Sequence, residues 1–206
     1  FAPMGSYSIT ATIADDDSTE YRSLPPPALT SSITSDTRLR GCRTYIASNS
    51  VTVASGATLT LQPGTVIKFN TGCQLTVNGT LSVNGTRINP VVFTSLKDDS
   101  HGGDANGDGD KSQAGNGDWN GIWVYGKADI AYAEMMYSGN GNERGIIQTS
   151  GSGSLTMMGC TVAHALNDGI WNWGGTISVT NTIFFDTGWA TAPYRGSKNE
   201  YINCVF

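Results

Sequence analysis

Charged side chains are scarce in this sequence, and their scarcity excludes several kinds of protein. Only 14% of the 206 residues are charged, and 17 acidic residues outnumber 12 Lys and Arg residues, which gives a net charge of −5. Nucleic-acid binding needs clustered Lys and Arg to neutralise phosphates, so we expect no nucleic-acid partner. Lys- and Glu-rich helical patterns are also scarce, whereas the 26 Gly residues favour strands joined by tight turns.

Long apolar runs and closely paired cysteines are missing too. No apolar segment approaches the ~20 residues that a membrane-spanning helix needs, so we predict no membrane span. The four cysteines include no C-x-x-C pair, which argues against a zinc site; they are Cys42, Cys73, Cys160 and Cys204.

What the sequence does contain is an internal repeat. Aligning "VTVASGATLTLQPGTVIKF" with "LTVNGTLSVNGTRINPVVF" places apolar residues 22 or 24 positions apart. The aligned pairs are Val51 with Leu75, Val53 with Val77, Leu59 with Leu81, Leu61 with Val83, and Phe69 with Phe93. Later residues continue the spacing in two series, Ile122, Ile146 and Ile170, and Cys160, Thr182 and Cys204. Each series is predicted to form a column.

This period predicts an all-β fold, a parallel β-helix (β-solenoid) of 22–24 residues per coil. Each coil consists of short strands that pair in parallel with their equivalents one coil away. Leucine-rich repeats share the period, but their Asn-containing L-x-x-L-x-L frame is missing. We expect the solenoid to occupy residues 46–206, preceded in residues 1–45 by an extended N-terminal strand and a proline-rich arm.

From about residue 45 onward the chain resembles the right-handed parallel β-helix repeat proteins of bacterial secreted and cell-surface origin. The segments that carry the resemblance are "VTVASGATLTLQPGTVIKF", "LTVNGTLSVNGT", "NPVVFTS", "DDSHGGDANGDGD" and "GDWNGIWV". This family includes surface proteins, adhesin-like modules and some polysaccharide-degrading enzymes. The resemblance therefore implies right-handed coiling and a secreted, extracellular or cell-surface location.

The N-terminal segment has a pattern of its own. Tyr7, Ile9 and Ile13 alternate with Ser and Thr residues, as in a half-buried strand, and the stiff segment "LPPPALTSS" follows. This strand lies along its own solenoid, is the remnant of a preceding domain, or is donated to the open sheet edge of a neighbouring subunit. Donation would make these three apolar residues part of an assembly interface.

Residues 98–118 form an acidic loop between two coils. Oxygen-bearing side chains alternate around a Gly, as Ca²⁺ binding requires, at Asp104, Asn106, Asp108 and Asp110. The residues that can complete such a site are Asp98, Asp99 and Asp118. The twelfth position, where an EF-hand has Glu, is Gly115, so we predict a structural calcium loop of another kind. A solvated acidic turn and a catalytic metal are the alternatives.

The cysteines divide into two pairs. Cys42 and Cys73 flank the first regular coils, and a disulfide between them would tie the N-terminal segment to the solenoid. Cys160 and Cys204 share a coil position two coils apart, about 9.6 Å between Cα atoms. A disulfide needs less than about 7 Å. We therefore expect these two to be free residues stacked with Thr182.

Tryptophans mark a candidate contact face. If the isoleucine column points inward, alternation directs Trp123 and Trp171 outward, with Ile147 between them. Trp173 lies in the same region. Exposed rings can stack on sugars, so this face is a candidate glycan site. Alternatively, the N-terminal arm or another subunit covers it, because large apolar patches seldom stay bare.

The sequence is compatible with more than one function. Outward carboxylates are scattered and form no dyad, so we assign no catalytic residue and favour a protein that is not an enzyme. Val205 and Phe206 belong to an unfinished coil whose apolar cross-section needs cover. The first hypothesis is an extracellular structural protein that joins copies of itself head to tail into a filament. The alternatives are a polysaccharide-binding or polysaccharide-degrading module, and a passive spacer from a long adhesin.

Overall fold

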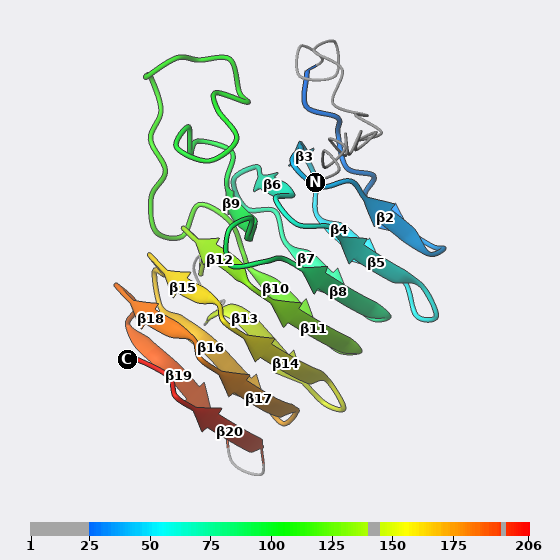
Figure 1. Cartoon of the computed structure of the whole chain (residues 1–206), viewed down its shortest axis with the longest axis vertical. Helices are drawn as coiled ribbons and strands as arrows, with labels where there is room; N and C mark the ends of the chain where they lie inside the picture. Colours follow the sequence, from blue (N-terminus) through cyan, green and yellow to red (C-terminus); the bar gives the residue numbers. More distant parts are fainter. Residues whose placement is uncertain (1–24, 140–144, 195–196) are drawn as a thin grey trace, which may run out of the picture.

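The chain winds into a parallel β-solenoid (Figure 1). This computed structural model describes residues 25–139, 145–194 and 197–206. Each complete coil contributes one strand to each of three parallel sheets. The described residues contain no helix, hence none that could span a membrane. The predicted fold class is confirmed.

The three sheets run side by side along the stack, and we number them by their first strand. Sheet 1 has seven strands: β1 (Ser32–Ile33), β4 (Val51–Val53), β7 (Leu75–Val77), β10 (Ile122–Val124), β13 (Gly145–Ser150), β16 (Asp168–Trp173) and β19 (Trp189–Pro193). Sheet 2 also has seven: β2 (Thr37–Leu39), β5 (Thr58–Leu61), β8 (Thr80–Asn84), β11 (Lys127–Ala131), β14 (Ser154–Met158), β17 (Thr176–Thr180) and β20 (Lys198–Ile202). Sheet 3 has six: β3 (Thr44–Ala47), β6 (Val66–Phe69), β9 (Val91–Ser95), β12 (Ala133–Met136), β15 (Thr161–Ala163) and β18 (Ile183–Phe185).

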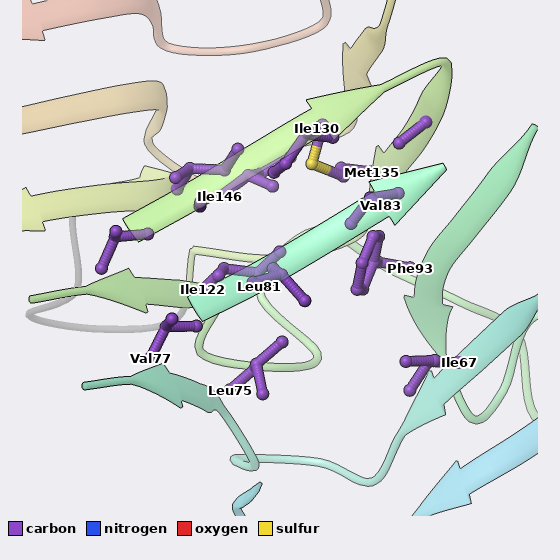
Figure 2. Close-up of a cluster of buried hydrophobic side chains, with 14 of the residues drawn as sticks. Ile67, Leu75, Val77, Leu81, Val83, Phe93, Ile122, Ile130, Met135 and Ile146 are labelled. Carbon is purple, nitrogen blue, oxygen red and sulfur yellow. The ribbon is translucent and has the colours of Figure 1, made fainter. Parts of the chain in front are cut away.

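Inward-facing apolar residues stack into columns that form the core. In sheet 1, Val51 pairs with Leu75, and Leu75 pairs with Ile122. Figure 2 shows side chains from all three sheets, such as Leu81 and Phe93, meeting in the interior. A single coil cannot bury its own inward face, so the stack itself creates the core.

Two predicted columns are shifted. Ile122 pairs with Ile147 rather than Ile146, and Ile147 pairs with Ile170, so successive spacings are 25 and 23 instead of 24 twice. Ile146 is buried one residue before the column. Phe93 pairs with Ile67 rather than Phe69. The reason is that eight residues lie between the paired positions Val83 and Val92, whereas four lie between their partners Leu61 and Val66.

The solenoid begins earlier than predicted. β1 and β2 already pair with β4 and β5, so the boundary at residue 45 is wrong by most of one coil. The proline-rich arm covers the free edge of β3, where Ile46 N donates to Pro27 O at 3.0 Å and Leu29 N donates to Ile46 O at 2.7 Å. Proline suits an edge because it offers no N–H to a further strand. The predicted strand with Tyr7, Ile9 and Ile13 lies outside the described residues.

Among the described residues, one residue with positive φ turns every corner from sheet 2 to sheet 3 except the corner between β8 and β9. The corner residues are Cys42, Gly64, Tyr132, Gly159, Asn181 and Asn203. Gly and Asn adopt this backbone most readily, which explains why they recur at intervals in the sequence.

The described cysteines are all free thiols. The Cys42–Cys73 disulfide is therefore not formed, because Cys42 lies at the corner between β2 and β3 and Cys73 at the different corner between β6 and β7. The predicted column of Cys160, Thr182 and Cys204 is confirmed by the register of the residues that follow each of them. Within it, Cys160 N donates to Thr182 Oγ1 at 3.4 Å.

Candidate functional site

An aromatic groove lies on the outward face of sheet 1. Trp123 of β10, Gln148 of β13 and Trp171 of β16 occupy equivalent positions on successive coils. The residue between the two predicted tryptophans is thus Gln148 and not Ile147, because the whole column is shifted by one residue. Two coils separate the tryptophan backbones by about 9.6 Å.

A second column of side chains runs beside the first. Ser150 pairs with Trp173, Tyr125 directly follows β10, and Tyr194 directly follows β19. The rings of Trp173 and Tyr194 are stacked, with centroids 4.2 Å apart and planes 19° apart. The Trp171 and Trp173 rings meet edge to face at 5.1 Å. Neither tyrosine was predicted from the sequence, since each lies one residue beyond a strand.

Shorter side chains on β13 separate two aromatic walls. Trp123 and Tyr125 form one wall, with centroids 6.2 Å apart, and Trp171 and Trp173 form the other. The resulting groove has a volume of about 350 Å³ and is lined by Trp123, Val124, Tyr125, Gln148, Thr149, Ser150, Trp171 and Trp173. Small-molecule sites typically measure ~300–1,000 Å³ and combine apolar walls with a few polar groups. The groove has both properties.

A buried polar network fixes the backbone behind the second wall. Asn172 lies between the two wall tryptophans and is 1% exposed. Its Oδ1 accepts hydrogen bonds from Thr149 Oγ1 at 2.7 Å and Gly175 N at 2.8 Å, and its Nδ2 donates to Asn199 Oδ1 at 2.8 Å. Since buried polar groups are costly unless paired, this network holds the turn after β16 in one conformation. It thereby positions Trp173.

The acidic loop occupies residues 96–121, between β9 and β10, as predicted (Figure 1). It covers part of the outward face of sheet 3, where the Lys68 side chain of β6 is fully buried. Lys68 Nζ donates to Asp98 O at 2.7 Å and also to Gly103 O. Burial lowers the pKa of Lys68, while the nearby carboxylates of Asp98, Asp99 and Asp104 oppose that shift.

Three of the predicted metal ligands converge. Carboxylate oxygens of Asp99, Asp104 and Asp108 all lie within 4.8 Å of one another. One oxygen of Asp99 and one of Asp108 are buried without a hydrogen-bond partner. Hydrogen bonds from the backbone N–H of Gly109, and then of Gly107, lower the pKa of Asp104.

Of the other predicted ligands, Asp98, Asn106 and Asp118 have partners within the protein. Asp98 accepts hydrogen bonds from Thr94 Oγ1 at 2.6 Å and from Ser100 N at 3.1 Å, and it contacts His101 Nδ1 at 2.8 Å. Although burial opposes the shift, hydrogen bonds from His101, Ser100 and Thr94 lower the pKa of Asp98. Asn106 donates to Asp108 at 2.9 Å. Asp110 is exposed and outside the converging trio.

Asp118 and Trp119 anchor the end of the loop. Asp118 forms an ion pair with Lys97 at 2.7 Å and accepts a hydrogen bond from Ser95 Oγ at 2.7 Å. Trp119 is completely buried, stacks on Phe69 with centroids 4.2 Å apart, and donates its Nε1–H to Met136 O at 2.7 Å. The Asp118 side chain thus stabilises the loop.

His101 fastens the loop to sheet 3. Its Nδ1 lies 2.8 Å from Asp98 Oδ2, and its Nε2 lies 3.4 Å from Glu134 Oε2 on β12. Hydrogen bonds to Asp98 and then Glu134 raise the pKa of His101 to about 9. At neutral pH the imidazolium therefore bridges the loop and the sheet.

Comparison with known proteins places the chain in a family. A family model described as a pectate-lyase like beta helix domain matches residues 31–158, more than half of the chain. The chain belongs to this family. Pectate-lyase-like beta helix domains are commonly extracellular. The match includes the groove wall on β10 and ends before the wall on β16. Searches among curated proteins and among solved structures gave no match.

Proposed function

We propose that this chain is an extracellular polysaccharide-binding β-helix module that holds a glycan in the aromatic groove of sheet 1. The supporting observation is the pairing of two aromatic walls with a floor formed by Gln148 and Ser150. Aromatic rings stack on the C–H faces of sugar rings, while amide and hydroxyl groups hydrogen-bond to sugar hydroxyls. The pectate-lyase-like family of the chain agrees with a polysaccharide ligand.

Binding is proposed rather than cleavage. Glycoside hydrolysis generally uses two carboxyl groups on either side of the scissile bond. The residues that line the groove include no Asp, Glu, His, Lys or Arg. The lining therefore offers groups for stacking and hydrogen bonding but none suited to proton transfer in hydrolysis.

The test is a binding screen with a matched pair of tryptophan variants. The intact chain is titrated with acidic and neutral oligosaccharides, and binding is followed by calorimetry. Trp171→Ala should weaken binding by at least about tenfold, because one ring contributes ~1.5–3 kcal/mol of apolar burial. Trp189→Ala is the control, since Trp189 is 73% exposed on the same sheet but outside the groove. Equal losses in the two variants, or no binding to any glycan, would argue against the proposal.

End-to-end assembly is a second candidate. Phe206 stacks on Phe184 with centroids 5.4 Å apart, yet Phe206 is 68% exposed and Val205 is 59% exposed. Covering these side chains with another copy would remove apolar surface from water. Sedimentation velocity of the intact chain over a range of concentrations tests this candidate. Concentration-dependent polymers that Phe206→Asp abolishes would support it, and a monomer at every concentration would count against it.

A further inference from the structure

The outward positions of sheet 1 carry no charge along the described strands. The first outward column consists of Ser32, Thr52, Thr76, Trp123, Gln148, Trp171 and Ala192. The adjacent column consists of Ala54, Asn78, Tyr125, Ser150, Trp173 and Tyr194. A ligand that follows these columns across the groove meets hydroxyls, amides and rings.

A neighbouring ion pair and the net charge of the chain also disfavour an anionic ligand. Lys127, the first residue of the adjoining sheet 2 strand, is paired with Asp129 at 2.7 Å, so its charge is already compensated. The whole chain carries a net charge of −5. A polyanion approaching the protein therefore experiences net repulsion at low ionic strength.

We propose that the groove selects neutral glycans and rejects polyuronates such as pectate, an inference that rests on the proposed polysaccharide-binding function. None of the described residues that line the groove offers a cationic partner to a uronate carboxylate. A carboxylate that enters the groove therefore loses hydration without compensation from this lining, and burying an unpaired charge is strongly unfavourable. A neutral sugar loses only hydroxyl hydration. The Ser150 hydroxyl at the floor can replace part of that hydration, and the aromatic walls cover the sugar's C–H faces.

The experiment compares neutral and acidic ligands of matched length on the intact chain. Oligosaccharides of β-glucan, xylan and galactan are titrated beside oligogalacturonate, with calorimetry as the readout. We expect at least one neutral ligand to bind about tenfold or more tightly than oligogalacturonate. Raising NaCl to about 1 M, where charges are screened beyond ~3 Å, should change neutral-glycan affinity less than about twofold.

Two variants in the groove and one control variant outside it test the selectivity further. Trp171→Ala should remove at least about nine-tenths of the neutral-glycan affinity, whereas Trp189→Ala should leave it unchanged. Ser150→Lys places a cation on the floor and should narrow the gap between neutral and acidic ligands.

The possible outcomes separate this inference from the proposed function. Tighter, salt-sensitive binding of oligogalacturonate would overturn the neutral-ligand inference and leave polysaccharide binding standing. Binding of a proline-rich peptide, which also docks on aromatic grooves, with no binding of any glycan would overturn both.

Discussion

Sheets 1 and 3 are built from the same coils, yet their outward faces differ. On sheet 3 the acidic loop accepts hydrogen bonds from the buried Lys68, and Val92, Met136 and Ala163 form a second buried apolar cluster. On sheet 1 the rings remain accessible, and Trp173 is 48% exposed. The repeat thus fixes the core, whereas the outward face depends on inserted segments and on individual side chains. One face is used for stability and the other is available to a ligand.

Replacing the core tryptophan at the end of the acidic loop and a tryptophan of the groove should have the largest and most different effects. Trp119→Ala should lower the free energy of unfolding by about 3–5 kcal/mol, because a fully buried ring and its hydrogen bond are lost. Trp173→Ala should cost less than about 1 kcal/mol while weakening glycan binding. Urea denaturation followed by circular dichroism measures both. Similar destabilisation by the two changes would show that the end of the loop and the groove do not differ in this way.

Lys68→Met should have the next largest effect. The substitution keeps an unbranched side chain but leaves the carbonyls of Asp98 and Gly103 without their charged donor. We expect a loss of about 2–3 kcal/mol, measured in the same denaturation assay. Lys127→Met is the control, because Lys127 is exposed and its ion pair with Asp129 contributes little. A loss no greater than the control's would contradict the structural role of Lys68.

A smaller effect should appear as a pH dependence of stability. The folded pKa of His101, about 9, lies above its unfolded value of ~6.5. The resulting stabilisation is therefore complete below about pH 6.5 and is lost as the pH rises through 9. After allowance for solvent screening, we expect about 1–2 kcal/mol, seen as the stability difference between the wild type and His101→Gln. Glu134→Gln should remove only part of this difference. If the stability difference between the wild type and His101→Gln does not vary with pH, a charged His101 does not link the loop to sheet 3.

Calcium binding is expected to change stability least. We propose that Asp99, Asp104 and Asp108 hold a structural Ca²⁺ ion, since their carboxylate oxygens converge and two of them lack partners. Calcium should then raise the melting temperature of the wild type by a few degrees and that of Asp104→Asn by less. Asp110→Asn should behave as the wild type. Identical melting curves in calcium and in chelator would refute the proposal.

The parts of this fold that repeat could be predicted from the sequence. Val51 with Leu75 and Leu59 with Leu81 were correctly aligned, because inward apolar residues recur at fixed intervals. The predicted pairing of Phe69 with Phe93 was wrong because turn lengths vary from coil to coil. Strand alternation carries no information on the length of a turn. The burial of Trp119 was not predicted, because a single aromatic residue in a polar loop belongs to no period.

Each candidate site could also be predicted only in part from the sequence. Alternation was enough to direct Trp123 and Trp171 outward, although it did not place Gln148 between them. The acidic cluster was visible as a motif. The partners that distinguish Asp98 and Asp118 from the converging carboxylates depend on the path of the loop, which the spacing of acidic residues does not specify.

The insertion between β9 and β10 has a consequence for protein engineering. Val53 and Val77 are 24 residues apart, whereas Val77 and Val124 are 47 apart, yet both pairs are adjacent in the same column. The corner between sheets 3 and 1 therefore tolerates a large extra segment without disturbing the strand register. Foreign peptides grafted at this corner would be displayed on a rigid rod at a defined height along its axis.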